Sequence, residues 1–537
     1  MHPPTEAAPD APGPLTPRAR RTAIGVGGAA VLLASLDAYV VVTILTGIAK
    51  DLSIAINDVQ RYTPIVTGFL LGYVAGMPLL GGLSDRLGRR TVILYCLGGF
   101  VVGSVITAAS IQIGTYLDLE PLHILVAGRA LQGLAGGALL PVTMALVADL
   151  WAEERRPQVL GTVGAAQELG SVLGPLYGAA LAAWIGWQGI FWINVPLAIA
   201  GMVGVAYALP GKTAAGSHGA SRQKVDVIGG VLLAISLAML TIGLNNPDPE
   251  QSVLPPNGPL FIGTGAAAFV AFLGWEWAAR TKLIDLAASK KLPFFSVLGA
   301  SFIAGAALLV TLLDISLFAQ GVLRMSDETE SAKLLVKFLV ALPIGAVLGG
   351  LLSPRLGLRT VAVAGFLISG LAYWLVAGWP ATVLSEHYGV LGLSLPRLDT
   401  DLAIAGLGLG LVIAPLSAAI LRVVPASQHG VASAGVVVAR SMGMLIGFAA
   451  LTGWGIHRFW EINRALTADL LADGFTADEQ TELDRLYTIS LLHEYNEIFK
   501  ATALLCVLAA VISIGIGTRR ESAALAVDAN KAPAPVA

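Results

Sequence analysis

Long apolar runs with almost no charge recur along the whole 537-residue chain, and they limit its fold more than any other feature. A helix needs about 20 apolar residues to cross a bilayer core of about 30 Å, where no water satisfies the backbone polar groups. Cutting the chain where charge, proline or glycine interrupts such runs predicts an all-α, polytopic membrane protein with fourteen transmembrane helices. The predicted spans are residues 22–49, 62–82, 91–112, 122–148, 158–185, 189–209, 226–246, 259–279, 294–320, 333–353, 360–378, 400–424, 429–457 and 498–518.

The composition supports an integral membrane protein and argues against several other classes. Of the residues, 55% are hydrophobic and 13% are charged, and the formal net charge of -2 indicates no nucleic-acid partner. The "GKT" at 211–213 lacks the earlier glycine of a phosphate loop, because Ala206 stands in its place. Neither a zinc-binding HExxH pair nor a nucleophile elbow occurs, and Cys96 and Cys506 lie in apolar runs. We therefore expect no enzyme, no metal site and no cofactor.

Lysine and arginine lie in alternate short loops, which orients the chain because positive residues stay on the cytoplasmic side. The basic loops include "DRLGRR", "WAEERRP" and "SPRLGLR", whereas "IQIGTYLDLEP", "IGWQG" and "NNPDPEQSVLPPNGP" are almost free of basic residues. Both termini are therefore predicted to be cytoplasmic, in a multi-pass protein of the inner (plasma) membrane. Residues 1–21, rich in proline and alanine, are predicted to be a disordered cytoplasmic tail, and residues 519–537 a second cytoplasmic tail.

Two ten-residue segments indicate an internal repeat. "GGLSDRLGRR" (81–90) follows the second span and "GLLSPRLGLR" (350–359) follows the tenth, with Pro354 in the place of Asp85. Parallel repeats of this kind build many secondary transporters. We predict an N-terminal six-helix half, two linker transmembrane helices and a C-terminal six-helix half, at residues 22–209, 226–279 and 294–518 respectively.

Four segments occur in an order that is typical of one transporter family. The segments are "LDAYVVVTIL" (36–45), "GGLSDRLGRR" (81–90), "GRALQGLAGGA" (128–138) and "GSVLGPLYGAA" (170–180). In that order, they resemble the first-helix acidic motif, the loop motif, the arginine motif and the antiporter motif of the major facilitator superfamily. With its fourteen spans, the chain resembles the drug:proton antiporters of that superfamily. The resemblance implies the major facilitator fold and transport driven by the proton motive force.

Four longer segments indicate a particular group of transporters within this family. The segments are "GAAQELGSVLGPLYG", "FWINVPL", "GLGLGLVIAPLSAA" and "LRVVPASQHG". They resemble segments of mycobacterial exporters of triacylglycerides and drugs, and the likeness runs along most of the chain. It implies a lipid or lipophilic substrate and a periplasmic lipid-binding lipoprotein as partner.

The loop at 81–90 is predicted to be a cytoplasmic gate motif. The arginines alone would be explained as residues that keep the loop on the cytoplasmic side of the membrane. The flanking glycines, however, allow a tight turn between close-packed helices. The family resemblance implies that Asp85 meets the N-terminal end of span thirteen, where the helix dipole stabilises an anion by about 0.3–1 kcal/mol. The motif residues are Gly81, Asp85, Arg86, Gly88, Arg89 and Arg90.

The antiporter motif places glycines four residues apart, so that they form one smooth ridge on the fifth span. Such a ridge lets a neighbouring helix pack closely, and a plain packing interface explains the glycines. A proline within the ridge is predicted to add a kink. The motif residues are Gly170, Gly174, Pro175 and Gly178.

Three ionisable residues lie inside apolar runs, where a charge at the bilayer centre costs at least about 2.5–3.5 kcal/mol. Asp37 in the first span and Arg129 in the fourth are predicted to couple or gate proton movement. Asp314 lies about 20 residues into the ninth span, near the outer interface, where water is expected to solvate it. Asp314 is therefore the weakest candidate of the three.

Glu168 and Arg440 are predicted to form an ion pair between the two halves. They lie roughly ten and eleven residues into spans five and thirteen, which both begin on the cytoplasmic side, so both residues are close to the midplane. A buried charge is tolerable when it is paired, and guanidinium matches carboxylate with two hydrogen bonds. The pair would close one side of the cavity and separate when a proton binds Glu168 or Asp37. The alternative is a static pair or a water-facing acid.

Residues 457–497 are predicted to form a helical hairpin in the periplasm. Apolar residues keep a helical spacing through "HRFWEINRALTADLLADG", which ends at Gly474, and "TADE" is a capping box with Thr476 as N-cap. A helix from about 430 to 472 would be about 65 Å long, twice the thickness of the bilayer core. A flexible loop is the alternative.

These features predict a secondary active exporter of triacylglyceride-like lipids, of lipophilic drugs, or of both, that alternates access between its halves. The spans consist mostly of Ala, Gly, Val, Leu and Ile, so we expect an apolar cavity. One alternative is a drug:proton antiporter with no lipid role. Another, from a different class, is a non-transporting membrane scaffold for envelope assembly.

Overall fold

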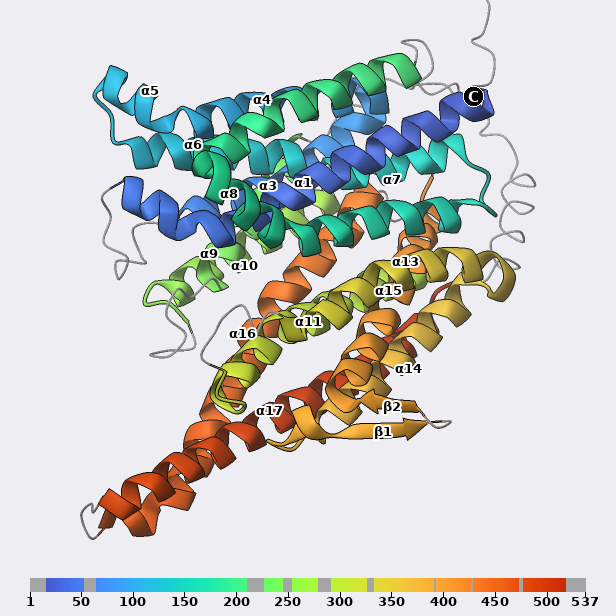
Figure 1. Ribbon diagram of the computed structural model, residues 1–537. Helices are drawn as coiled ribbons and strands as arrows, with labels where there is room; N and C mark the ends of the chain where they lie inside the picture. The colour runs from blue at the N-terminus through green and yellow to red at the C-terminus, as the bar shows by residue number, and fades with distance from the viewer. Residues whose placement is uncertain are drawn as a thin grey trace, which may run out of the picture.

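The computed structural model describes residues 16–52, 64–209, 227–244, 254–278, 291–325, 333–390, 393–425, 428–472 and 477–517. Almost all of them are helical, which confirms the predicted all-α class. The helices form two bundles that lie close together at one end and diverge toward the other (Figure 1). We call the end that holds Gly88 and Gly357 the basic end, because the arginine-rich turns lie there, and the other end the opposite end.

The first bundle is built from the helices before residue 209. They are α1 (Pro17–Asp51), α3 (Pro64–Leu87), α4 (Arg89–Ala108), α5 (Ser110–Leu117), α6 (Pro121–Gly137), α7 (Leu139–Leu150) and α8 (Arg156–Ala208). Helix α1 packs along α8, and both α3 and α4 pack on α6.

The second bundle follows two linker helices, α9 (Val227–Leu244) and α10 (Gly258–Ala278), which pack on each other and, through α9, on α3. Its main helices are long. They are α11 (Lys291–Gly321), α13 (Val336–Leu356), α14 (Leu358–Val376), α15 (Arg397–Val423), α16 (His429–Ala472) and α17 (Ala477–Ser513).

The predicted internal repeat has a matching backbone in the two bundles. Gly88 between α3 and α4 has φ 87° and ψ 147°, and Gly357 between α13 and α14 has φ 90° and ψ 148°. A positive φ of this size strains residues with a side chain, so glycine is needed at both turns. The two ten-residue segments therefore form the same helix–turn–helix corner, although Pro354 replaces Asp85 in the second.

Helix α8 contains both the fifth and the sixth predicted spans. The chain reverses between them at Gly186, whose φ of 69° is the only non-helical backbone inside α8. The predicted boundary at residues 186–188 is therefore confirmed. The backbone remains helical through Pro175, so the expected kink at this proline is not seen as a break in α8.

Two predicted boundaries are wrong. Helix α1 begins at Pro17, so residues 17–21 are helix rather than disordered tail, because Thr16 caps the helix and its hydroxyl accepts from the Ala19 N–H at 3.3 Å. Helix α5 (Ser110–Leu117) extends five residues beyond the predicted end of span three at residue 112, into a segment that was predicted to be a loop. The remaining parts of both tails lie outside the described residues.

A small antiparallel hairpin was missed. Strands β1 (His387–Val390) and β2 (Leu393–Pro396) pair with His387 opposite Pro396, and they follow a 3-10 turn at Val383–Ser385. The hairpin lies at the opposite end, where the Tyr388 hydroxyl donates to the buried Asp401 carboxylate at 3.1 Å. It fills a connection that was predicted only as a loop between two spans.

Within the described ranges, eleven helices are long and apolar enough to cross a membrane. The segment Ile228–Leu244 is apolar but shorter, and neither the first half of α8 nor α16 is among the eleven. Those two segments carry Glu168 and Arg440 and are rich in glycine and alanine. The chain is thus a multi-pass membrane protein, and the number fourteen stays a prediction.

The buried apolar residues are distributed unevenly between the two ends. At the basic end one continuous core joins both bundles, since it includes Met144 and Leu160 of the first and Ala300 and Leu416 of the second. Toward the opposite end the core divides into a cluster within the first bundle and a cluster within the second. The two bundles therefore pack on each other at the basic end and separate beyond it.

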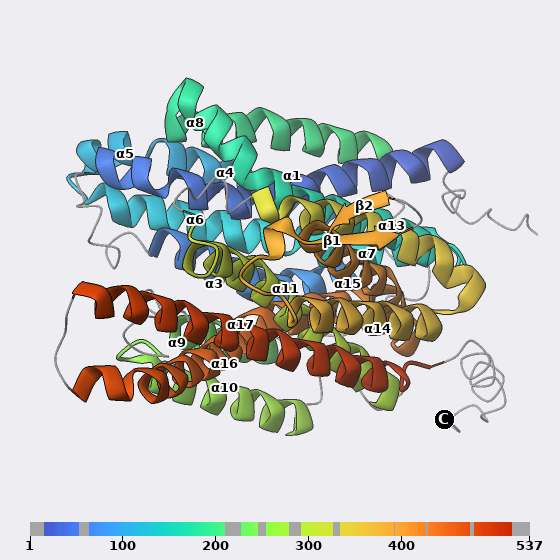
Figure 2. The same cartoon turned by 60° about the horizontal axis from the view of Figure 1, so that its bottom comes forward.

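Helices α16 and α17 form a long helical hairpin that extends past the neighbouring helices of its bundle (Figure 1), and the two helices run side by side (Figure 2). Helix α16 covers His429–Ala472, which agrees with the predicted helix from about 430 to 472. Arg458 donates to Glu497 across the hairpin at 2.8 and 3.0 Å. The flexible-loop alternative is therefore wrong for these helices, whereas the predicted caps Gly474 and Thr476 lie outside the described residues.

Candidate functional site

Glu168 and Arg440 form the predicted ion pair between the two bundles. Arg440 Nη1 on α16 donates to Glu168 Oε1 on α8 at 2.9 Å. The Glu168 side chain is 4% exposed and that of Arg440 is 15% exposed, so the pair is largely removed from solvent. The contact joins α8 of the first bundle to α16 of the second, and removal of either partner would leave an unpaired buried charge.

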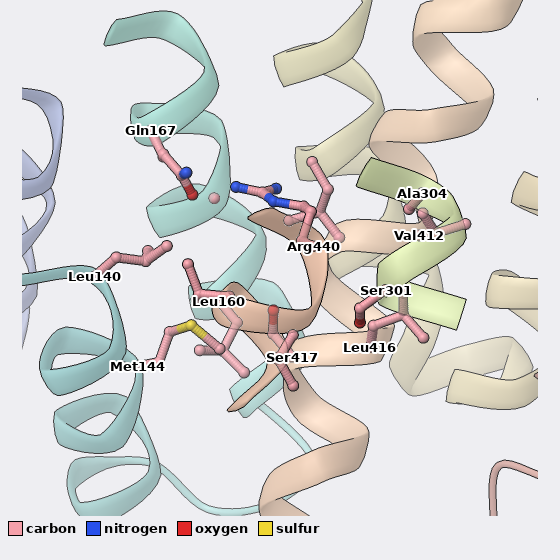
Figure 3. A pocket seen from close by; sticks show the side chains of 14 residues that line it. Leu140, Met144, Leu160, Gln167, Ser301, Ala304, Val412, Leu416, Ser417 and Arg440 are labelled. Atoms are coloured by element: carbon pink, nitrogen blue, oxygen red, sulfur yellow. The ribbon is translucent and has the colours of Figure 1, made fainter. Parts of the chain in front are cut away.

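A small cavity lies beside this pair, between the two bundles (Figure 3). Its volume is about 40 Å³, and Gln167 and Arg440 point toward each other at one side of it. The remaining lining is mostly apolar and comes from α7, α8, α11, α15 and α16; it includes Leu140, Met144, Leu160, Ala304, Val412 and Leu416, together with Ser301 and Ser417. This space is far too small for a lipid with three acyl chains.

Asp37 and Arg129 form a second buried pair, inside the first bundle. Arg129 Nη1 on α6 donates to Asp37 Oδ2 on α1 at 2.6 Å, and both side chains are at most 1% exposed. Asn194 on α8 donates to the other Asp37 oxygen at 2.7 Å, and the Arg129 guanidinium lies 4.2 Å from the centre of the Phe69 ring. The carboxylate is thus held by charge and by hydrogen bonds in an interior that excludes water.

Gln132 completes this network on the side of α4. Its amide donates to Ser104 at 2.8 Å, while its carbonyl oxygen accepts from Arg129 at 3.1 Å. Hydrogen bonds therefore link α1, α6 and α8 at the Asp37 carboxylate, and Gln132 extends the network to α4.

The antiporter-motif glycines place α8 against α1 between these two pairs. A Cβ atom on Gly170 would lie 2.6 Å from Ser35 Cβ, and one on Gly174 would lie 2.9 Å from Tyr39 Cβ, so only glycine permits this approach. Gly178 is also buried. The packing role predicted for the ridge is confirmed at Gly170 and Gly174, and the ridge faces α1 while Glu168 faces α16.

The gate motif makes the contact that the family resemblance implied. The backbone N–H groups of Gly430 and Val431, in the first turn of α16, donate to the Asp85 carboxylate at 2.9 and 3.2 Å. Arg89 lies 2.5 Å from Asp85 and also donates to Asp149 at 3.0 Å. The carboxylate is therefore held by a helix N-terminus and by a guanidinium at once.

The close approach at the gate depends on small residues. A Cβ atom on Gly81 would come within 2.9 Å of the Gly430 carbonyl oxygen. Arg90 is half-buried, and Arg86 is exposed, so Arg86 takes no part in the contact with α16. The basic end is also joined by Arg422 and Glu153, which lie 2.6 Å apart on the two bundles.

Asp314 does not lie where it was expected. It was predicted to be solvated near an interface, but it is 1% exposed within the core of the second bundle, and neither carboxyl oxygen has a hydrogen-bond partner. The prediction considered only the position of Asp314 along the span and not the face of the helix on which it lies. The buried environment makes Asp314 a stronger functional candidate than the sequence indicated.

Three residues of these networks were not identified from the sequence. Asn194 and Gln132 lie in motifs that were recognised, but as neutral residues in apolar surroundings they carried no charge signal. Asp149 lies at the end of span four, where it was taken for part of a loop. Gln132 lies one helical turn from Arg129, whereas Asn194 is marked only as a polar side chain within an apolar run.

Replacing Asp85 with Asn is expected to loosen the basic end. The change removes a charge-assisted contact that is worth about 1.5–3 kcal/mol, which corresponds to roughly a tenfold or greater increase in the open population. Ser417 lines the central cavity and is 7% exposed, so a Ser417→Cys reporter should react about tenfold faster with a membrane-impermeant maleimide. Arg86→Ala is the matched control and should leave the rate unchanged. Equal rates in wild type and Asp85→Asn would contradict a gating contact.

Comparison with known proteins gives a consistent result. The Major Facilitator Superfamily profile matches residues 28–448. The chain is 51% identical over 511 residues to a protein of Mycobacterium tuberculosis named triacylglyceride transporter, covering 94% of this chain and 96% of that protein. It is 55% identical over 461 residues to the triacylglyceride transporter of Mycobacteroides abscessus, covering 85% and 87% of the two chains.

Two solved structures share the fold at low sequence identity. The human organic anion transporter MFSD10 superposes with a TM-score of 0.57 at 16% identity, covering 92% of this chain and 99% of that one. The proton:xylose symporter XylE superposes with a TM-score of 0.56 at 14% identity, covering 95% and 99%. At such identities these structures establish the architecture and carry no information on substrate.

Proposed function

Because the chain belongs to the Major Facilitator Superfamily, we propose that this secondary transporter exports triacylglyceride-like lipids, together with lipophilic drugs. The proposed substrate rests on the 51% identity to a triacylglyceride transporter over 94% of the chain. The mostly apolar lining of the central cavity supports it, since a sugar or a peptide would need more polar partners than Gln167, Arg440 and two serines supply.

In this proposal the chain crosses the inner membrane fourteen times, with the basic end and both termini in the cytoplasm. The distribution of arginine between alternate loops supports the orientation. The two bundles move as the halves of an alternating-access transporter, and α9 and α10 are membrane-embedded linkers. The shared core at the basic end and the separate cores beyond it then correspond to a conformation that is closed to the cytoplasm.

Glu168 and Arg440 act as a lock between the halves. In the closed state the pair joins α8 to α16 at 2.9 Å, next to the cavity that must widen to admit a lipid. Opening toward the cytoplasm separates the two charges, which is favourable only when the Glu168 carboxylate is neutralised or rehydrated. A proton reaching Glu168 therefore releases the lock, and no bound cofactor is needed.

Asp37 serves as the proton-coupling residue of the first bundle. A proton on its carboxylate weakens the attraction of Arg129 and changes the hydrogen bonds from Asn194 and Gln132. Since α1 also packs on the glycine ridge of α8, movement of α1 is transmitted to the helix that carries Glu168. Asp37 and Glu168 thus act as two coupled sites and not as one cluster.

A periplasmic lipid-binding lipoprotein is the proposed acceptor. The α16–α17 hairpin supports this partner because it extends from the end at which lipid would leave and has exposed apolar side chains. Trp460 is 49% exposed and Tyr487 is 48% exposed.

Replacing Asp37 with Asn is expected to abolish proton-driven transport. The amide keeps the shape of the carboxylate but can neither bind a proton nor balance Arg129. Purified protein in liposomes should transfer a fluorescent triacylglyceride to acceptor vesicles faster when a pH gradient is imposed. The Asp37→Asn variant should lose this gain while its gradient-independent transfer persists.

The same assay separates the proposal from its alternatives. Transport of a lipophilic drug without any transfer of triacylglyceride would favour a drug:proton antiporter. A non-transporting scaffold would be favoured by two results together. The liposomes would transport neither the drug nor the triacylglyceride, and cells that carry Asp37→Asn would have wild-type envelope lipids.

A further inference from the structure

His429 is the first residue of α16, and its ring lies at the contact between the two bundles. The residue is 5% exposed, and its Nδ1 atom lies 3.9 Å from Asp149 Oδ1 on α7. That separation is too long for a hydrogen bond but lies within the range of an ion pair. Among the described residues, Nδ1 has no hydrogen-bond partner. A buried polar atom without a partner is unusual, so the contact with Asp149 calls for an explanation.

Asp149 uses its two oxygens toward different bundles. Its Oδ2 accepts from Arg89 Nε, in the first bundle, at 3.0 Å, while its Oδ1 faces His429 of the second bundle. Arg89 in turn donates to the Ser84 hydroxyl at 2.7 Å and lies 2.5 Å from the Asp85 carboxylate. Asp149 therefore joins the arginine of the gate motif to a histidine on the facing helix.

The charges in direct contact here do not balance. Two carboxylates, those of Asp85 and Asp149, share the single guanidinium of Arg89. The N-terminus of α16 adds only a partial positive charge, and its N–H groups are directed at Asp85. A proton on His429 would supply the missing positive charge on the side of Asp149.

The other described charges near the first turn of α16 have partners of their own or are exposed. Arg156 at the beginning of α8 donates to two backbone carbonyl oxygens at the end of α7, at 2.8 and 3.1 Å. Arg422 on α15 lies 2.6 Å from Glu153, and Lys291 on α11 is exposed. Helix α9 has no ionisable side chain. Of the side-chain types present in these contacts, only imidazole ordinarily changes its charge between about pH 5 and pH 8.

We propose that His429 is a positioning residue of the gate, which in its protonated form pairs with Asp149 and holds the first turn of α16 against the first bundle. This inference rests on the proposed alternating access and adds to it a proton-dependent contact at the basic end. The attraction is present while the ring is charged, and it is lost as the pH rises through the titration of the ring. At high pH, Asp149 keeps its bond to Arg89 but no longer attracts α16.

The position of His429 explains how its proton reaches the gate. His429 directly precedes Gly430 and Val431, whose N–H groups donate to Asp85. A Cβ atom on Gly430 would lie only 2.8 Å from Ser84 Oγ, so this turn is pressed closely onto α3. A small displacement of His429 therefore carries both N–H groups away from the Asp85 carboxylate.

The sign of this effect differs from that of the lock. A proton on Glu168 separates the bundles in the proposed mechanism, whereas a proton on His429 holds them together. Opening of the basic end is therefore coupled to the release of a proton from His429 into the water at that end. The direction of a pH response distinguishes the two sites.

The movement is tested with spin labels at Arg86→Cys and Arg355→Cys, two exposed positions at the basic ends of α3 and α13. The native cysteines are buried, so the labels react at the introduced positions. In the full-length protein in nanodiscs, the population with a long label distance should rise several-fold between about pH 5.5 and about pH 8. His429→Gln should show no such rise, and Asp149→Asn should also lose the pH response.

A matched control and a second measurement complete the test. His457 lies exposed on the same helix, so His457→Gln should keep the wild-type pH response. In the protein with nitrogen-15-labelled histidine rings, the NMR signal that is absent from His429→Gln should report a charged ring at about pH 5.5 and a neutral ring at about pH 8. A ring that stays neutral, or the same pH response in wild type and His429→Gln, would overturn the proposal. Neither readout requires transport, so a failure of the proposed lipid export would be recognised separately.

Discussion

Replacing Glu168 with Gln is expected to abolish transport while the protein still folds and inserts. Glutamine keeps the size and the hydrogen-bonding oxygen of the side chain but leaves the Arg440 guanidinium without its counter-charge. Breaking a buried pair by removing one partner costs about 3–5 kcal/mol, which shifts the closed population by roughly a hundredfold to several thousandfold. Arg440→Ala should have the same effect, since it leaves Glu168 unpaired at 4% exposure.

Two further variants make this test specific. Exchange of the charges, Glu168→Arg with Arg440→Glu, should restore part of the transport, because the attraction between the halves returns while the proton-binding carboxylate moves to α16. The exposed pair of Glu482 and Arg485, 3.4 Å apart, is the control, and Glu482→Gln should leave transport unchanged because such surface pairs contribute little. Near-normal export by either single variant at the lock would contradict this mechanism.

The contacts that the sequence predicted are those fixed by depth and by sign of charge. Glu168 and Arg440 lie at nearly equal distances from the basic ends of their helices, and opposite charges at equal depth in an apolar interior attract each other. The contact of Asp85 with the first turn of α16 was implied by the family resemblance of its loop motif, and the glycines of that motif indicated the tight turn beside it. The depth of a residue within a span, the sign of its charge and the positions of glycines can all be inferred from a single sequence.

The contacts that were missed depend on the face of a helix and on neutral polar groups. Asp314 points into the bundle, and the run around it is apolar on every side, so no periodicity marks the buried face. Asn194 and Gln132 contribute hydrogen bonds whose value appears only when Asp37 and Arg129 are placed between them. The β1–β2 hairpin was missed because only ten residues alternate, between two much stronger helical signals.

Removing the outer part of the α16–α17 hairpin is expected to impair lipid export much more than drug efflux. Residues 465–486 can be replaced by a short Gly-Ser linker, because α16 and α17 lie side by side where the Phe459 and Tyr487 ring centres are 5.1 Å apart. The cut keeps the bonds from Arg458 to Glu497, so the base of the hairpin stays intact. Transfer of fluorescent triacylglyceride to acceptor vesicles and efflux of a lipophilic drug are then measured on the same preparation.

The physical reason for this asymmetry lies in the solubility of the two substrates. A small drug leaves the central cavity into water or the outer leaflet unaided, whereas a triacylglyceride needs a continuous apolar surface until an acceptor takes it. The hairpin offers such a surface, since Trp460, Leu466 and Tyr487 are each at least 40% exposed. A full-length variant with Trp460→Gln and Leu466→Gln keeps the hairpin but removes part of this surface, and it should lose lipid transfer while drug efflux persists. Equal loss of both activities in the shortened protein would mean that the hairpin supports the fold of the transporter and has no role specific to lipid.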